Sequence, residues 1–496
     1  MPRATTWVFA LGIGLSACGG ARAPGAKAAV VTAADVEQDP GATADAAPDA
    51  GIVEDVAPDA IAPTDAPTCT TATCDDGNPC TADLCDAKVG CGHKALPDGG
   101  PCGVGTCSGV CLAGECTPTE LFEAVYTGGG EDLPAAMVAL PDGFAIAGVQ
   151  GSLGIGILRT DLQGNGLWAK TYGNQDNSIT AAVPMALLKL SDGFALAAEK
   201  GDWNGYYDGW LLRTDASGDK LWEQTYGGGA FDSTYAMAAL ADGFALAGIT
   251  ESKGNGKGDF WLIRTDLDGK RLWDEAYGTN TLEAARGLVA LSDGFALVGS
   301  RYEANSMSGK TTAWLVRTDT AGIVLWDQIY GADVGGSANA LVSVPSGFVF
   351  AGAHMLPGPS QLWLVRTDTA GKLLWQRDYD AGPGAAAESL IADSNGLAFT
   401  AGKNKNDAWL FRTDTAGNLQ WMQKRDGNAY GYGYVSLAAT ADGFAWSGWQ
   451  DTSGPSSYDI WLRRTDFWGN NTCADSGACA AKPASACVTC AKGVCL

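Results

Sequence analysis

The sequence predicts an all-β fold: a seven-bladed β-propeller of four-stranded antiparallel blades, closed by its N-terminal strand, with small disulfide-rich flanking modules. Three observations predict it. The tripeptide Arg-Thr-Asp occurs seven times at spacings of 46 to 54 residues, a period typical of propeller blades. The 68 glycines and 17 tryptophans favour short strands joined by tight turns. Cysteines lie toward both ends of the chain and are absent between Cys116 and Cys473.

Residues 1–17 are predicted to be a signal peptide, because one basic residue precedes an apolar run that ends in small residues. The tetrapeptide Leu15-Ser16-Ala17-Cys18 resembles the lipobox of bacterial lipoproteins. That resemblance implies cleavage before Cys18 and acylation of this cysteine, and several acyl chains anchor a protein stably to a bilayer. The alternative is an ordinary signal peptide that ends at a chance cysteine.

The lipoprotein resemblance also implies a location. The protein would be secreted through the inner membrane, and Gly19, which stands where an aspartate would mark retention, points to the outer membrane. The periplasmic and the surface face both stay open. Residues 18–68 combine the lipidated cysteine with a linker rich in Ala, Pro and Asp that lacks any apolar period. Such a segment cannot bury enough surface to fold, so we expect a disordered tether.

Two cystine-rich segments flank the propeller, at residues 69–119 and 471–496. They hold nine and five cysteines, and such clusters predict disulfides and an oxidising compartment. Since both numbers are odd, at least one bridge must connect the clusters if every cysteine pairs. The cysteines nearest the propeller ends are Cys116 and Cys473, which we predict to be bonded. The connectivity within each segment stays open.

The first cystine-rich segment contains a candidate calcium site. Residues 74–85 resemble the short Asp-Asp-Gly-Asn-Pro-Cys modules of bacterial surface proteins, and their loop offers Asp75, Asn78 and Asp83 as oxygen ligands. Their spacing is not that of an EF-hand, and Asp-Gly-Asn-Pro is an ordinary turn. We therefore expect no metal and no cofactor, with calcium as the weaker alternative. Zinc at the Cys487/Cys490 pair is expected even less, because no second pair has matching spacing.

The propeller, residues 120–470, has the same turns in each repeat. Asp-Gly joins the first two strands, with Ser346 and Asn395 replacing the aspartate in two copies, and is a strong hairpin signal. The third and fourth strands are joined by Asp-x-x-Gly, where the carboxylate can accept hydrogen bonds from turn amides. The glycines after the first turn are expected to have positive φ, namely Gly143, Gly193, Gly243, Gly294, Gly347, Gly396 and Gly443.

The fourth strand carries the residues that we expect between blades. A tryptophan recurs there and can bury about 150 to 250 Å² against a neighbour, at Trp168, Trp222, Trp273, Trp326, Trp375 and Trp421. The seventh repeat ends without a fourth strand, whereas residues 121–126 match that strand's pattern. We therefore expect residues 121–126 to complete the last blade and to close the ring.

Residues 366–375 resemble the tryptophan-docking repeat of quinoprotein-type propellers and, more loosely, the Asp-box of sialidases. The similarity covers about ten residues per blade and concerns residues that are structural in both families. It supports the propeller and implies neither a quinone cofactor nor sugar cleavage.

Charge and composition narrow the functional classes. A net charge of −24 without a basic cluster repels phosphate, so we expect no nucleic-acid partner. The only histidines are His93 and His354, which disfavours a histidine-dependent catalytic site. Aspartates and arginines that recur in every blade are best explained as turn or ion-pair elements. We therefore predict no catalytic residues and a protein that is not an enzyme.

Binding residues are expected where the blades differ. The most divergent loops are residues 200–208, 301–311, 354–361 and 428–434, and two of them carry aromatic residues beside glycine: Trp203, Tyr206, Tyr207, Tyr430, Tyr432 and Tyr434. These side chains suit a polysaccharide or protein surface, or else they fill the contacts between blades.

We predict a monomeric, membrane-anchored binding or scaffold protein. The alternatives are a glycan-active hydrolase or lyase, which needs two non-repeated acidic residues at one end of the ring, and an envelope-assembly scaffold.

Overall fold

The computed structural model describes most of the propeller and part of the cystine-rich segments. The described residues of the propeller are 122–127, 132–150, 154–173, 182–201, 206–303, 310–356, 360–382, 384–402, 407–425, 435–451 and 458–467. Outside it, the described residues are 74–75, 80–86, 90–96, 101–104, 107–112, 115–118, 490–491 and 494–495.

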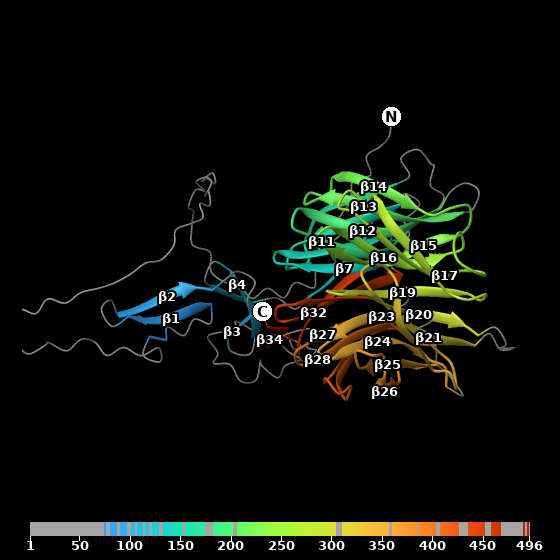
Figure 1. Ribbon diagram of the computed structural model, residues 1–496. Helices are drawn as coiled ribbons and strands as arrows, with labels where there is room; N and C mark the ends of the chain where they lie inside the picture. The colour runs from blue at the N-terminus through green and yellow to red at the C-terminus, as the bar shows by residue number, and fades with distance from the viewer. Residues whose placement is uncertain are drawn as a thin grey trace, which may run out of the picture.

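The predicted fold is confirmed: seven four-stranded antiparallel sheets are arranged as the blades of a propeller (Figure 1). Six blades are formed by four consecutive strands each. The first blade comprises β7 (Asp132–Leu140), β8 (Gly143–Gln150), β9 (Ile155–Thr160) and β10 (Gly166–Tyr172). The second comprises β11 (Ala182–Leu190), β12 (Gly193–Gly201), β13 (Tyr207–Asp215) and β14 (Lys220–Tyr226). The third comprises β15 (Asp232–Leu240), β16 (Gly243–Thr250), β17 (Asp259–Thr265) and β18 (Arg271–Tyr277).

The remaining blades follow in chain order. The fourth comprises β19 (Glu283–Leu291), β20 (Gly294–Tyr302), β21 (Thr311–Thr318) and β22 (Val324–Tyr330). The fifth comprises β23 (Gly336–Val344), β24 (Gly347–His354), β25 (Gln361–Thr367) and β26 (Leu373–Tyr379). The sixth comprises β27 (Ala386–Asp393), β28 (Gly396–Gly402), β29 (Ala408–Thr413) and β30 (Leu419–Arg425). The seventh comprises β31 (Ser436–Thr440), β32 (Gly443–Asp451), β33 (Tyr458–Asp466) and β6 (Glu123–Tyr126).

The seventh blade confirms the predicted closure. Strand β6 pairs antiparallel with β33, with Tyr126 opposite Ile460 and Glu123 opposite Arg463. The first strands of the seven blades also contact one another in a closed cycle, in which β31 meets β7. These strands therefore surround a common axis, and the beginning of the propeller domain holds its end in place.

The cystine-rich segments contain short strands. In the first segment they form a hairpin and a three-stranded sheet, made of β1 (Thr81–Asp86), β2 (Gly90–Ala95), β3 (Pro101–Val104), β4 (Cys107–Leu112) and β5 (Glu115–Pro118). In the second they form one pair, β34 (Cys490–Ala491) and β35 (Val494–Cys495). A disulfide joins Cys74 to Cys91.

The recurrent Arg-Thr-Asp arginine fastens the first turn of each blade to its third strand. In the first blade, the Arg159 guanidinium donates to Asp142 and to the carbonyl oxygens of Phe144 and Thr160. The same arginine–aspartate pair occurs in blades two, three, four and seven. In the sixth blade, where Asn395 replaces the aspartate, Arg412 pairs with Asp393 instead at 2.7 Å. These charges are therefore ion-pair elements of the fold, as predicted.

The Asp-x-x-Gly turn also has its predicted geometry. Asp161 Oδ1 accepts hydrogen bonds from the backbone N–H groups of Gln163 and Asn165, at 2.9 and 2.7 Å. Gly164 in this turn has φ of +80°. The expectation of a positive φ after the first turn holds for six glycines but is wrong for Gly443, which does not have one. Glycine is still needed there, because a Cβ would lie 2.0 Å from the Thr465 carbonyl oxygen.

The fourth strand of each blade packs against the next blade, as the aromatic series predicts. The Trp168 ring meets Phe194 of the second blade edge-on, with centroids 6.1 Å apart, and lies against the turn glycine Gly218. Tyr172 donates its hydroxyl hydrogen to the Gly218 carbonyl oxygen at 2.7 Å. Phe122 replaces the tryptophan in the closing strand and contacts Phe144 and Gly164 in the same way.

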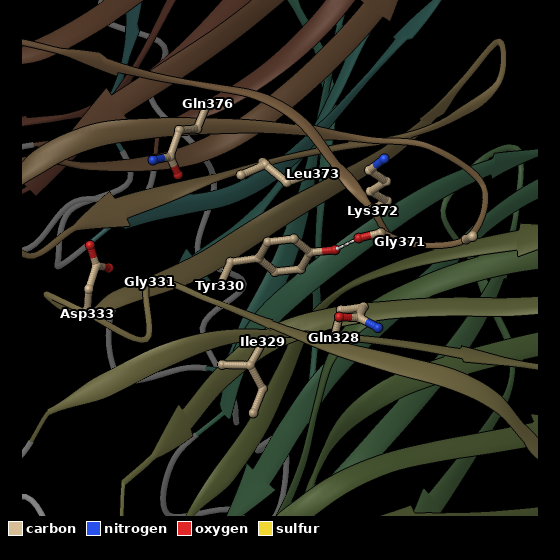
Figure 2. A pocket seen from close by; sticks show the side chains of 10 residues that line it. Gln328, Ile329, Tyr330, Gly331, Asp333, Gly371, Lys372, Leu373 and Gln376 are labelled. Atoms are coloured by element: carbon tan, nitrogen blue, oxygen red, sulfur yellow. Dashed lines mark hydrogen bonds between the residues drawn. The ribbon is translucent and has the colours of Figure 1, made fainter.

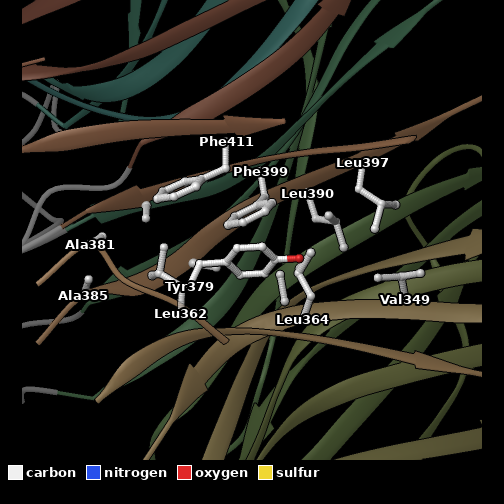
Figure 3. Close-up of a cluster of buried hydrophobic side chains, with 13 residues drawn as sticks. Val349, Leu362, Leu364, Tyr379, Ala381, Ala385, Leu390, Leu397, Phe399 and Phe411 are labelled. Carbon is white, nitrogen blue, oxygen red and sulfur yellow. The ribbon is translucent and has the colours of Figure 1, made fainter. Parts of the chain in front are cut away.

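Among the described residues the hydrophobic core forms seven clusters, one in each contact between neighbouring blades. Figure 3 shows the cluster between blades five and six, where Tyr379 lies beside Phe399 and Phe411. The rings of Phe399 and Phe411 are stacked with centroids 4.9 Å apart. Because every cluster takes side chains from two blades, no blade has a core of its own.

Candidate binding site on the propeller axis

The two ends of the propeller differ in sequence variability. One end, the hairpin face, carries the repeated turns between first and second strands and between third and fourth strands. The other end, the loop face, carries the connections between second and third strands and those between blades, because successive strands alternate in direction. The described ends of three divergent loops, residues 200–208, 301–311 and 354–361, adjoin the ends of β12, β20 and β24 at the loop face. The fourth, residues 428–434, lies outside the described residues.

The aromatic candidates are only partly placed. Tyr206 is 50% exposed at the loop face. Tyr207 packs instead on Phe231, which lies in the connection to the next blade, with centroids 5.7 Å apart. Tyr206 therefore suits a surface role, whereas Tyr207 fills a contact between blades. The other candidates, Trp203, Tyr430, Tyr432 and Tyr434, lie outside the described residues.

A second set of non-repeated residues lies on the axis and was not predicted. In six of the innermost strands the pairing skips one residue, which forms a β-bulge. In β15, for example, Thr234 is opposite Gly248 and Ala236 is opposite Ala247, so that the strand register skips Tyr235. The corresponding residues of the six blades are Ala135, Met185, Tyr235, Arg286, Asn339 and Glu388.

Four side chains form what we call the axial cluster: Glu199, Tyr235, Arg286 and Glu388. The Arg286 guanidinium lies over the Tyr235 ring, 4.9 Å from its centroid. The same guanidinium acts electrostatically on Glu388, two blades further on, and on Glu199, two blades back. Side chains from blades that are not neighbours can approach one another only across the axis. The cluster therefore spans the axis, and it lies in the half nearer the loop face.

Both carboxyl groups of the axial cluster hold their protons more tightly than usual. Burial raises the pKa of Glu388 to about 7, against the opposing effect of Arg286. Burial also raises the pKa of Glu199, although Ser233, which donates to Glu199 Oε2 at 3.0 Å, and Arg286 both act against it. Near neutral pH, Glu388 is therefore close to an equal mixture of its neutral and charged forms.

The axial cluster has unused hydrogen-bonding capacity. Arg286 is exposed, and neither it nor Glu388 makes a hydrogen bond or an ion pair with any residue that the structure describes. This contrasts with the arginines of the hairpin face, which are paired. A planar guanidinium with five N–H donors, close enough to a carboxyl group to act on it electrostatically, can bind a polar ligand together with that group.

The sequence did contain a signal for this set. Each bulged residue stands seven positions before the aspartate of the first turn or its replacement, as Arg286 does before Asp293 and Glu388 before Asn395. That position varies among alanine, methionine, tyrosine, arginine, asparagine and glutamate, whereas the neighbouring positions are mostly small or apolar. Strand periodicity alone could not show that this side chain turns toward the axis.

Another pair of carboxyl groups lies off the axis, between blades three and four. Asp259 Oδ1 and Glu283 Oε2 both lie within 3 Å of the point that a Cβ of Gly278 would occupy. Burial, and then the nearby Glu283, raise the pKa of Asp259 to about 6. Glu283 accepts hydrogen bonds from the hydroxyl groups of Thr279 and Thr281, at 2.6 and 2.5 Å. These contacts fasten the loop between the blades.

A shallow groove of about 520 Å³ lies on the outer side, between blades four and five. Figure 2 shows Tyr330 on its floor, bonded to the Gly371 carbonyl oxygen, with Ile329 and Leu373 at its sides. The residues that line it belong to the repeated pattern of strand and turn. The groove is therefore a consequence of blade packing, and it carries less information about function than the axis does.

Both histidines have structural partners. His93 Nδ1 lies 2.8 Å from Asp83 Oδ1 in the β1–β2 hairpin. His354 is buried, stacks on Trp363 and has its Nδ1 2.8 Å from Asp378.

The calcium candidates are described only in part. Asp83 faces His93, and Asn78 lies outside the described residues. Within the described ranges, no group of three or more His, Cys, Asp or Glu side chains is placed to hold a metal. Cys18, Cys473 and the side chain of Cys116 lie outside the described part of the chain, so lipidation and the Cys116–Cys473 bridge stay predictions. The described residues also include no helix long and apolar enough to cross a membrane.

Comparison with known proteins adds one local likeness. Residues 73–96, which include the β1–β2 hairpin, match the family model of the Dictyostelium (slime mold) repeat. No curated protein matches the chain. The propeller fold supports a role in binding or scaffolding, and the axial cluster is its best candidate site.

Proposed function

We propose that the protein is a monomeric binding protein that holds its propeller on a membrane-anchored tether and presents the loop face to a polysaccharide or protein. The observation that carries this proposal is the position of the non-repeated residues. The described ends of three divergent loops and the axial cluster lie toward the same end, whereas the hairpin face repeats the same turns around the ring. A rigid scaffold with variable loops at one end is the usual arrangement of a binding surface.

Binding is tested with the full-length chain on glycan arrays and in pull-downs from cell-envelope extracts. We expect one of these to yield a ligand whose binding is weakened by Tyr206→Ala at the loop face. Leu325→Ala on the outer rim is the matched control, because Leu325 is also exposed, at 56%. A ligand that is lost with Leu325→Ala and kept with Tyr206→Ala would contradict the proposed face.

The membrane anchor is a separate part of the proposal. It is supported by the match of residues 15–18 to a lipobox and by the linker that follows. Metabolic labelling with a radioactive fatty acid is expected to mark the protein, and Cys18→Ser is expected to abolish the label. Unchanged labelling of the Cys18→Ser protein would show that Cys18 is not the anchor.

A glycan-active enzyme is the second candidate, and one observation favours it. Glu199 and Glu388 are non-repeated carboxyl groups that converge on the axis, and both have a raised pKa. A general acid needs a carboxyl group that keeps its proton near neutral pH. Product analysis of array hits separates the candidates, since a binding protein returns its glycan intact, whereas an enzyme yields fragments that Glu388→Gln abolishes.

A further inference from the structure

We propose that the axial cluster binds the carboxylate group of a sugar acid, with Arg286 as its cationic partner and Glu388 as a second hydrogen-bond donor. This inference deepens the proposed function and rests on it, because it names the chemistry of a ligand that reaches the loop-face half of the axis.

Arg286 is the cationic group of the proposed site. Its guanidinium is exposed and lies over Tyr235, and it has no hydrogen-bond or ion-pair partner among the described residues. In a chain with a net charge of −24, an arginine without an acidic partner is unusual. Its five N–H donors match a carboxylate, which accepts two parallel hydrogen bonds from a guanidinium. Tyr235 holds the planar group in position through the cation–π contact.

Glu388 is the second hydrogen-bond donor of the proposed site. It lies near enough to feel the charge of the same guanidinium, which belongs to a blade that is not its neighbour, and no ion pair joins the two among the described residues. Burial and Arg286 are the two influences on its pKa, which is about 7. In its neutral form Glu388 adds no negative charge and offers one O–H donor to an incoming carboxylate. A carboxylate between Arg286 and neutral Glu388 would thus be bound from both sides.

The surroundings favour a sugar acid with one charged group. Glu199 accepts a hydrogen bond from Ser233, and Asn339 on the neighbouring inner strand donates its amide to the Ala387 carbonyl oxygen, so that the side-chain oxygens are the acceptors on offer. Such groups suit ligand hydroxyls. The overall charge of −24 disfavours a polyanionic chain, so that a single terminal uronate fits the electrostatics better.

The test measures binding of glucuronate and galacturonate to the full-length chain by calorimetry, with the methyl ester of each as the uncharged arm. We expect the acids to bind at least about tenfold more tightly than the esters, and Arg286→Met to remove this preference. Arg377→Met is the matched control, since Arg377 is also exposed and lies over a ring, that of Trp375. A peptide with a free C-terminal carboxylate is a further arm, and tighter binding of the peptide would overturn the assignment to a sugar acid.

The pH dependence is the second readout. Because the bound carboxylate favours neutral Glu388, affinity for the acids is expected to rise as the pH falls from about 8 to about 6. Glu388→Gln, which stays neutral, should bind with nearly the same affinity across this range. Acids that bind no better than esters, or equally well to Arg286→Met, would overturn the inference. If a ligand from the arrays or pull-downs still binds in that case, the proposed function survives; if none binds, both fail.

Discussion

One tyrosine hydroxyl links each of six pairs of neighbouring blades. Tyr330 is typical: it is buried, and it donates to the Gly371 carbonyl oxygen of the next blade at 2.5 Å. Removing the hydroxyl leaves that carbonyl without its partner inside the core, which costs about 1 to 2 kcal/mol. Tyr330→Phe is therefore expected to lower the free energy of unfolding by this amount in urea denaturation. Tyr302→Phe is the control: Tyr302 is 43% exposed, and its loss should change nothing measurable.

Glu388 is expected to make stability depend on pH. Its folded-state pKa is about 7, above the ordinary value of 4.5, so the folded chain binds more protons than the unfolded chain between these values. Stability must then fall as the pH rises through this window and stay lower above it, by about 3 kcal/mol in total. Glu388→Gln should be more stable than the unsubstituted protein at about pH 8 and no more stable at about pH 4. Equal stability of the two at both pH values would show that Glu388 is well solvated.

Residue types were enough to predict the contacts that recur from blade to blade, but not the contacts that replace them where a blade lacks the usual aspartate. The arginine, aspartate and glycine of each turn could be assigned because each has one favourable role in a hairpin. The sequence did not show that Asp393 would take over from Asn395, or that Arg366 would donate to the Pro345 carbonyl oxygen where serine replaces aspartate. Such substitutions depend on which atom lies within reach, and that requires coordinates.

Bulges explain two features of the strands that periodicity could not predict. On the innermost strand of six blades, the bulge places one non-repeated side chain toward the axis. On the outer strand, the pairing skips the leucine before the tryptophan, as at Leu221, which is 54% exposed. An alternating pattern would place successive residues on opposite faces and would bury one of them. The four strands and their turns could thus be predicted, whereas the exposed leucines and the axial cluster could not.

The outer bulge leads to a prediction about stability. Leu221 is the bulged residue of its strand and is exposed to solvent, and Gln420 occupies the same position in the sixth blade. Leu221→Gln should therefore change the free energy of unfolding by less than about 0.5 kcal/mol. Leu212→Ala in the neighbouring strand is the contrasting variant, since Leu212 is fully buried and its truncation should cost about 2 to 5 kcal/mol. A large loss with Leu221→Gln would mean that another surface covers the outer leucines.

At the closure of the ring, the residues that join neighbouring blades differ from those of the repeat. Six fourth strands end in tyrosine, but β30 ends in Arg425, which faces the closing strand β6. Arg425 is buried, bonds Glu123 Oε1 at 2.6 Å and lies 4.5 Å from the centroid of the Trp461 ring. Glu123 is also bonded by Arg463 of the partner strand β33. The closing strand is therefore held by an ion-pair network where the other blades use one neutral hydrogen bond.

This network should be measurable as a coupling free energy. Burial raises the pKa of Glu123, but Arg463 and Arg425 outweigh it and hold the pKa below its ordinary value. The network therefore stabilises the fold above that value, and its contribution is lost as the pH falls through the folded-state pKa. In a double-mutant cycle of Glu123→Gln and Arg425→Gln at neutral pH, we expect a coupling of about 1 to 3 kcal/mol.

The exposed pair Lys170–Asp219, which also joins two blades, is the control for this cycle and should give less than about 0.5 kcal/mol. The comparison separates two explanations of the closure. If β6 is held mainly by backbone pairing and the contact of Phe122 with Phe144, the two cycles will give the same small value. If Glu123 fastens the strand, only the Glu123–Arg425 coupling will be large, and it will disappear at low pH. At low pH, the ring would then open first between β30 and the closing strand β6, where Arg425 stands in place of the tyrosine.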